Sequence, residues 1–217
     1  MRTSALQSSA KDQLSLYVFV FVLFVVGVVF GALMINALTL GQQQDLSDDV
    51  QQFILHIQNG TLQQGSDTFA DRAWFQAKWL LLVWVLGLTV VGMPFVLALD
   101  FLKGVLVGFA IGMLVREFAW KGLVFSLASV APVNLIAVPA FLIASVAAVT
   151  FAAHVVKSRF LGRFGSLGRP LLTFTATAAV MLVLLIAAAL IESYLTPILL
   201  RWAAPLVDGA APGLESF

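Results

Sequence analysis

Long apolar stretches without charge alternate along the chain with short polar segments. A helix needs about 20 apolar residues to cross the hydrocarbon core of a bilayer. Residues 16–35 meet this length and contain no charged side chain. Arg2 and Lys11 precede this stretch as in a signal peptide, but the apolar run is longer than a secretory core and lacks a clear small-x-small cleavage site. We therefore expect a retained transmembrane helix.

Four further stretches have the composition of membrane spans: residues 79–99, 101–115, 135–153 and 171–191. Trp74 and Trp79 are placed to anchor the second span at the membrane interface. Asp100 and Lys103 mark the expected boundary between the second span and the third. The pattern predicts an all-α fold, a polytopic membrane helix bundle with about five transmembrane helices.

The uncharged stretch 122–153 is too long for one ordinary span and contains Pro132 and Pro139. We expect a helix break at Pro132, Asn134 and Pro139, with a short interfacial or re-entrant helix at 120–130 before it. Irregular backbone at membrane depth is tolerated where protein or water covers it, so the 131–134 turn should lie inside the bundle or at its mouth. An alternative is that 101–130 forms a re-entrant hairpin, which would reverse the side on which later loops lie.

The only substantial polar segment before the second span, residues 41–72, is acidic. It should carry a short amphipathic outer helix, capped by Asp45 or Ser47 and ended by Asn59-Gly60. The apolar positions that show the helical period are Leu46, Val50, Phe53, Ile54 and Ile57.

Glycines recur at four-residue spacing in two of the expected spans. Gly27 and Gly31 share one face of the first span, and Gly104, Gly108 and Gly112 share one face of the third. In a membrane such a face opens a groove for close helix packing. We expect these glycines to serve packing within the chain or with a second copy in a homodimer.

Basic residues cluster in the segment 154–170, which contains no acid. The positive-inside rule places this loop in the cytoplasm. With five spans, the N-terminus then lies in the cytoplasm, and the acidic loop 41–72 and the C-terminus lie outside. Residues 1–202 form one transmembrane domain in this interpretation, and 203–217 form a flexible C-terminal tail.

Composition supports the membrane interpretation and narrows the chemistry. Hydrophobic residues make up 61% of the 217 positions and charged residues only 11%, which a soluble domain of this length could not bury. Cysteine is absent, so disulfides and thiolate metal sites are excluded. The net charge of +1 is a near-cancellation of 12 basic and 11 acidic side chains, and nothing indicates a nucleic-acid partner.

Candidate catalytic groups are scarce. The acids of loop 41–72 are best explained as the solvated face of a helix, and His56 and His154 fall on opposite sides of the membrane, too far apart to share a metal. The remaining charged residues near the bundle lie at expected span ends, where pairing or snorkelling makes them inexpensive: Asp100, Lys103, Arg116, Glu117 and Glu192. No glycine loop with a phosphate-binding lysine is present. We expect no catalytic residues, no metal and no cofactor.

Several motifs resemble one known family. The block Phe101-Leu-Lys-Gly-Val-Leu-Val-Gly-Phe-Ala-Ile-Gly-Met-Leu-Val115 is similar to the third hydrophobic block of stage II sporulation protein M. Similar features are Trp120-Lys-Gly-Leu, the Pro132–Pro139 segment, the closing Glu192-Ser-Tyr-Leu-Thr-Pro-Ile-Leu199 and the Gly27/Gly31 block before Asn36. The resemblance covers nearly the whole chain, and the glycine-lysine block combined with the ending Glu-x-Tyr-Leu-x-Pro is fairly specific.

The resemblance implies a multi-pass protein of the bacterial cell membrane at the sporulation septum, required for engulfment of the forespore. Its implied partners are two single-span peptidoglycan hydrolases, the stage II sporulation proteins D and P, which it would recruit or scaffold without cutting glycan. The leading hypothesis is therefore a non-enzymatic scaffold in membrane lipid. The alternative is a small permease or the membrane subunit of a transporter, because discontinuous helices such as the one expected near Asn134 often mark substrate sites.

Overall fold

The computed structural model describes residues 2–58, 66–89, 91–160 and 168–208, which are almost entirely helical and contain no strand. The elements are α1 (Arg2–Met34), a 3₁₀ turn η1 (Ile35–Ala37), α2 (Leu40–Gln58), α3 (Ser66–Gly87), α4 (Gly92–Phe160) and α5 (Gly168–Asp208). Helix α4 consists of two arms joined by a sharp bend at Ala119. The arm before Ala119 is called the first arm here, and the arm after it the second arm.

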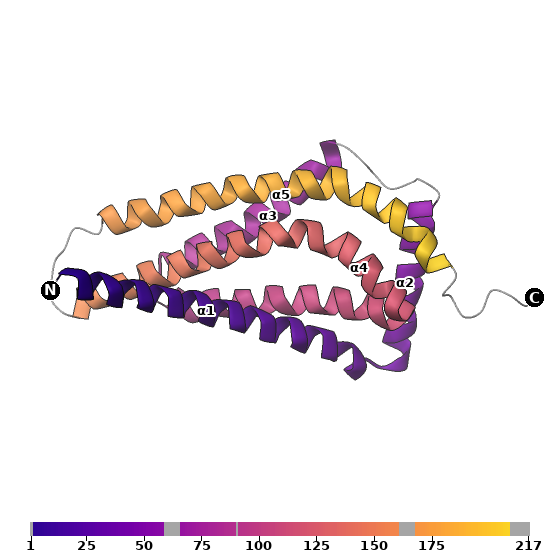
Figure 1. Cartoon of the computed structure of the whole chain (residues 1–217), viewed down its shortest axis with the longest axis horizontal. Helices are drawn as coiled ribbons and strands as arrows, with labels where there is room; N and C mark the ends of the chain where they lie inside the picture. The colour runs from indigo at the N-terminus through magenta and orange to yellow at the C-terminus, as the bar shows by residue number, and fades with distance from the viewer. Residues whose placement is uncertain (1, 59–65, 90, 161–167, 209–217) are drawn as a thin grey trace, which may run out of the picture.

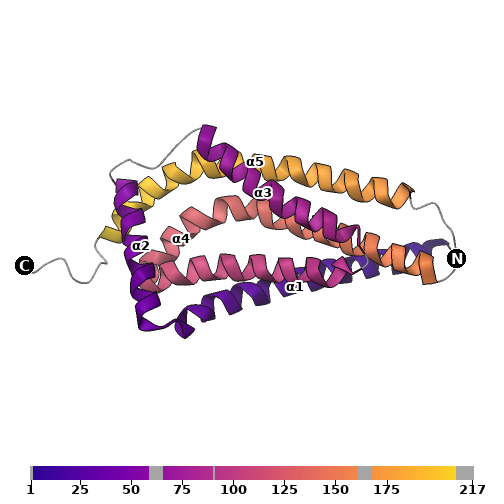
Figure 2. The ribbon, with the colours of Figure 1, turned by 180° about the vertical axis from the view of Figure 1, so that it is seen from behind.

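The long helices lie side by side along the long axis of the molecule, with α4 between α1 and α5 (Figures 1 and 2). Helix α2 crosses one end of this bundle, which we call the α2 end. The N-terminus of α1, the end of α4 and the start of α5 meet at the opposite end, which we call the N-terminal end. Helix α3 runs from the α2 end toward the N-terminal end, as the second arm of α4 does.

Among the residues that the structure describes, four helical stretches are long and apolar enough to cross a membrane: Gln13–Ala37, Gly92–Ala128, Val130–Ser158 and Gly168–Leu200. The expectation of a polytopic helical membrane protein is thereby confirmed. Helix α3, which carries Asp71, Arg72 and Lys78, is not among these stretches. The exact number of five spans therefore stays a prediction.

The second expected span, residues 79–99, is wrong in its position. Helix α3 ends at Gly87 and a new helix begins at Gly92, so a turn lies in the middle of the expected span. The Thr89 hydroxyl donates to the Leu86 carbonyl (2.9 Å), and a side chain at Gly92 would overlap that same carbonyl. Pro94 suits the first turn of the new helix, where a backbone N–H has no helical partner. The third span accordingly begins at Gly92 and not at residue 101.

The expected break at Pro132, Asn134 and Pro139 is not where the chain turns. Both prolines lie inside the second arm of α4, which is helical through 120–160. Neighbouring helices support the backbone groups that proline frees in a membrane helix. The chain reverses instead at Ala119, which has φ 50° and ψ −128°. Gly122 then packs directly on the Leu114 carbonyl, where any side chain would overlap the backbone.

We predict that Ala119→Gly stabilises the protein. A non-glycine residue at positive φ is strained by about 1–3 kcal/mol, whereas glycine adopts this conformation freely. The larger unfolded-state entropy of glycine offsets about 1 kcal/mol of that relief, so we expect a net gain of about 1 kcal/mol. Thermal unfolding in detergent micelles measures it. An Ala119→Val variant should melt below the parent chain, and a destabilised glycine variant would contradict the strained turn.

The acidic loop carries α2, and this helix begins earlier than expected. Thr39 and Gln42 form a reciprocal capping box: the Thr39 N–H donates to Gln42 Oε1 (3.1 Å), and the Gln42 N–H donates to Thr39 Oγ1 (3.5 Å). The cap is therefore Thr39 and not Asp45 or Ser47. The expected stop at Asn59-Gly60 lies outside the described residues.

The ends of α4 and α5 extend into segments expected to be irregular. Helix α4 continues to Phe160 and α5 begins at Gly168, so all described residues of the basic segment 154–170 are helical. Helix α5 also continues past residue 202 to Asp208, into the expected flexible tail, whose residues 209–217 lie outside the description.

Candidate functional site

The glycines singled out in the sequence lie together in one contact, between α1 and the first arm of α4. Side chains at Gly27 and Gly31 would overlap the carbonyl oxygens of Phe101 and Val105, respectively. A side chain at Gly108 would overlap the Val28 carbonyl in the same way. The contacts advance in the same direction along both helices, so the two helices are parallel. In the structure the glycine faces of α1 and of the first arm of α4 therefore pack against each other within one chain.

Asp100 and Lys103 do not lie at a helix end, as the sequence suggested, but well inside the first arm of α4. Asp100 is 3% exposed, and its carboxylate accepts a hydrogen bond from the Ser145 hydroxyl of the second arm (2.8 Å). Its second oxygen, Oδ2, is buried and has no hydrogen-bond partner among the described residues. Ionisable residues inside membrane spans are costly and mark functional sites by default.

Lys103 is held by aromatic rings. Its ammonium lies 3.5 Å from the ring centroid of Phe141 and 5.7 Å from that of Trp79. Cation–π contacts of this kind strengthen when water is excluded from them. Lys103 thus brings a positive charge into the space between α3 and the two arms of α4.

That space is a cavity of about 350 Å³, which we call the polar cavity. Its polar lining consists of Arg72, Gln76, Lys103, Asn134 and Glu192. Its apolar lining consists of Phe75, Trp79, Leu106, Val107, Ala110, Val130 and Val133. The cavity therefore combines several convergent polar groups with an apolar wall, as ligand and docking sites do.

Hydrogen bonding in the polar cavity is incomplete. Arg72 and Glu192 form an ion pair that links α3 to α5. Asn134 donates to the Val130 carbonyl of its own helix (2.8 Å). Gln76 is only 5% exposed, yet its Oε1 finds no partner among the described residues. A buried acceptor without a donor costs about 1–3 kcal/mol, so this arrangement favours a molecule that completes it.

The polar cavity opens to the side and is closed toward the N-terminal end. Phe75 and Leu106, at its margin, are 55% and 49% exposed. Beyond it lies a core built from α3, both arms of α4 and α5, which contains Leu80, Val96 and Phe141 among other apolar residues. This geometry suits the binding of a group that arrives laterally and not passage of a solute along the described bundle.

A second polar assembly joins α2 to the bend of α4. Arg116 donates to the Ile35 carbonyl (3.2 Å) and to Gln43 Oε1 (2.5 Å). Glu117 accepts from Ser47 (2.6 Å) and Gln51 (3.5 Å). These hydrogen bonds, which we call the α2 clamp, hold α2 across the end of the bundle.

The exposed acids of α2 lie outside this clamp. Asp45, Asp48 and Asp49 are exposed. His56 lies on α2 and His154 near the N-terminal end, so the structure places the two histidines at opposite ends of the bundle. Within the described residues no group of three or more His, Cys, Asp or Glu side chains could hold a metal ion.

Sequence reasoning missed the polar cavity because the second span was placed across the boundary between α3 and α4. With the span ending at residue 99, Asp100 and Lys103 appeared to be interfacial. The run Gly87-Leu-Thr-Val-Val-Gly92-Met-Pro94 contains the glycine and proline punctuation of a turn and is the signal that places them correctly.

These features define a class: a polytopic helical membrane protein with a polar cavity between its helices and a polar helix held across one end. Residues 20–197, most of the chain, match the family model described as stage II sporulation protein M. The chain belongs to this family, a family of sporulation membrane proteins, as its motifs indicated. Neither a curated protein nor a solved structure matches it.

Proposed function

We propose that the protein is a non-enzymatic scaffold that holds single-span peptidoglycan hydrolases, the stage II sporulation proteins D and P, at the sporulation septum during engulfment. The polar cavity carries this proposal. It presents Lys103 toward a lateral opening flanked by exposed apolar side chains, beside the buried Gln76, whose Oε1 has no hydrogen-bond partner among the described residues.

Polar groups facing lipid are unfavourable, because hydrocarbon offers them no hydrogen bonds. A partner's transmembrane helix that carries a polar side chain would cover the opening and supply the missing bonds. Interhelical hydrogen bonds of this kind contribute about 0.6–2 kcal/mol in membranes, and close apolar packing adds to them. A single-span protein has such a helix available, whereas a solute would need a path that the apolar core does not offer.

The α2 clamp supports the same function outside the bundle. Because Arg116 and Glu117 fix α2, its acids form a surface of constant geometry next to the mouth of the bundle. In the orientation that we propose, with the basic N-terminal end in the cytoplasm, this surface faces the cell wall, where the hydrolases act. A basic region of a partner would complement it.

The proposal predicts that filling the polar cavity abolishes partner recovery. Ala110 lines the cavity and Ala98 is exposed on the same arm of α4 without lining it. We expect Ala110→Phe to reduce co-purification of the two hydrolases from membranes at least roughly tenfold, the factor that about 1.4 kcal/mol represents. Ala98→Phe, the matched substitution on the same helix, should leave recovery unchanged.

Both variants must first show the melting temperature of the parent chain in micelles, so that loss of fold is separated from loss of docking. Full recovery of both hydrolases with well-folded Ala110→Phe would overturn docking at the polar cavity. If both variants lost hydrolase recovery equally, any large side chain on the surface of α4 would disturb assembly, and the polar cavity would have no special role.

A further inference from the structure

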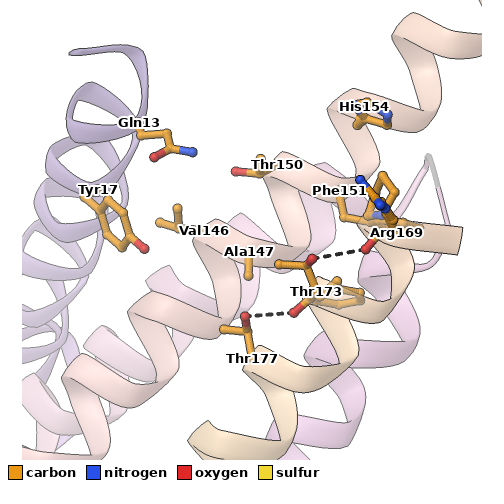
Figure 3. Close-up of a pocket in the computed structure, with 12 residues that line it drawn as sticks. Gln13, Tyr17, Val146, Ala147, Thr150, Phe151, His154, Arg169, Thr173 and Thr177 are labelled. Carbon is orange, nitrogen blue, oxygen red and sulfur yellow. Dashed lines mark hydrogen bonds between the residues drawn. The ribbon is translucent and has the colours of Figure 1, made fainter. Parts of the chain in front are cut away.

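A second cavity lies at the N-terminal end, at the opposite end of the bundle from α2. It has a volume of about 530 Å³ and is formed by α1, the second arm of α4 and α5. Figure 3 shows Gln13 and Tyr17 pointing from α1 toward α4, and Thr173 and Thr177 on α5 at the other side. We call it the basic-end cavity, because Arg169 and His154 stand at its rim.

The described residues that line the basic-end cavity are rich in hydrogen-bond donors and include no acid. Gln13, Tyr17, Thr150, His154 and Arg169 come from three helices and face one space. Their side chains make no hydrogen bond to another described residue. Such a set suits an anion, since the guanidinium and the neutral donors all supply hydrogens and nothing in the lining repels negative charge.

The remaining hydroxyls have a different role. Thr173 and Thr177 donate to the carbonyls of Arg169 (3.0 Å) and Thr173 (2.9 Å) in their own helix. The hydroxyl hydrogens of Thr173 and Thr177 are thus already bonded within α5. The methyl groups of these two residues add apolar surface to the lining. The rings of Phe151 and Phe174 stack with centroids 5.3 Å apart and form an apolar floor.

A shallow apolar groove, lined by described residues of α5 alone, continues from this cavity along that helix. It has a volume of about 430 Å³, is lined by Leu172, Ala176, Val180 and Met181, and shares Thr173 and Thr177 with the basic-end cavity. From residue 172 to residue 181 an α-helix rises by about 14 Å, a length over which a hydrocarbon chain can lie. The two spaces together have one basic, donor-rich end and one apolar end.

We propose that the basic-end cavity binds the phosphate headgroup of an anionic phospholipid, with an acyl chain in the groove beside α5. Arg169 stands at the start of a long apolar helix, at the depth where lipid phosphates meet helix ends. Basic pockets between transmembrane helices are known to take such headgroups. The shared chemistry is a phosphate anion, and the adjoining groove selects the lipid over free phosphate because only the lipid fills both spaces.

The test is a titration of the purified full-length chain in detergent, followed by native mass spectrometry. The probes are phosphatidylglycerol and phosphatidylcholine with identical acyl chains. We expect tighter binding of phosphatidylglycerol and a roughly fivefold loss with Arg169→Gln, the effect of about one cation at a membrane surface. Lys157→Gln is the matched control, because Lys157 is an exposed cation at the same end that does not line the cavity.

Two further variants separate the parts of the site without changing charge. Tyr17→Phe removes one donor and should weaken phosphatidylglycerol binding by a few-fold, as the loss of one net hydrogen bond of about 1 kcal/mol does. Ala176→Trp blocks the groove and should weaken binding of phosphatidylglycerol while leaving any binding of inorganic phosphate unchanged. Melting temperatures equal to that of the parent chain establish that the variants are folded.

Three results would overturn the assignment. Equal losses with Arg169→Gln and Lys157→Gln would show diffuse surface attraction without a site. Both lipids carry a phosphate, and only phosphatidylglycerol has a net negative headgroup, so equal affinity for the two would show that the cavity does not select an anionic lipid. Displacement of the lipid by inorganic phosphate at matched concentration would identify a free-anion site instead. The titration uses the chain alone, so its outcome is independent of whether hydrolases dock at the polar cavity.

Discussion

Replacing Gly108 by leucine should separate α1 from α4 and cause the largest loss of stability of any single substitution proposed for this chain. A side chain at this position would overlap the Val28 carbonyl, and backbone atoms cannot move aside as a flexible side chain can. Overpacking of a tight contact costs about 1–3 kcal/mol and sometimes more. We expect a loss of about 3 kcal/mol or more, because the two backbones would have to part along their whole contact.

Thermal unfolding in micelles measures this loss, and Gly41→Leu provides the matched control. Gly41 lies in α2, where a side chain would meet nothing within 4 Å, so its substitution should leave the stability unchanged or raise it by up to about 1 kcal/mol. Equal melting temperatures for Gly108→Leu and the parent chain would contradict the contact.

A disulfide can show that the glycine face is used within one chain. A side chain at Gly112 would approach the Cα atom of Ala32 to 3.0 Å. The chain has no native cysteine, so the double variant Ala32→Cys, Gly112→Cys introduces the only pair. Oxidation should give a cross-linked monomer, whereas a cross-linked dimer would place the same glycines between two copies.

The main features of the fold could be predicted from the sequence because they depend on local composition. The apolar stretch around residues 16–35 has few alternatives to a membrane helix, and it forms part of α1. The four-residue spacing of the glycines likewise fixes which face of α4 can approach another helix closely. What the spacing does not specify is the partner, since α1 and a second copy both offer suitable faces.

The errors have a common physical cause: membrane helices tolerate the residues that end soluble ones. Pro132 and Pro139 suggested a break, but neighbouring helices support the backbone there and the helix continues. The bend occurs at Ala119, a residue type that carries no turn signal, and packing of Gly122 on Leu114 accompanies it. Local sequence could not reveal a strained conformation that tertiary contacts impose.

The polar cavity could be predicted only in part. Asn134 was singled out as part of the expected helix break, and it does line the cavity. The cavity itself depends on where α3 turns back, because that turn carries Asp100 and Lys103 into the bundle. A shift of a span boundary by about ten residues, well beyond the uncertainty usual for helix ends, changed these residues from interfacial to internal.

Removing the ammonium of Lys103 should destabilise the bundle far more than removing that of an exposed lysine. Asp100 is buried, and Lys103, one helical turn later, is the cation whose charge acts on it. Asp100 and Lys103 form no direct ion pair within 4 Å, so the loss should lie at the lower end of the about 3–5 kcal/mol that breaking a buried ion pair costs. We expect Lys103→Met to lower the free energy of unfolding by about 3 kcal/mol. Lys78→Met is the control, since the ammonium of the exposed Lys78 lies over Trp74 (5.1 Å) and contributes about 0.5–1 kcal/mol there.

The double variant Asp100→Asn, Lys103→Met distinguishes a coupled pair from two independent contacts. If Lys103 serves mainly to compensate Asp100, neutralising both should recover most of the stability that Lys103→Met loses, because replacing a buried pair by uncharged groups is often neutral. The asparagine can still accept the hydrogen bond from Ser145 through its side-chain oxygen. The coupling energy from unfolding in micelles should then exceed about 1 kcal/mol. Strictly additive losses would show that the two charges act separately, and the ammonium of Lys103 would then be held by Phe141 and Trp79 alone and remain free to meet a partner.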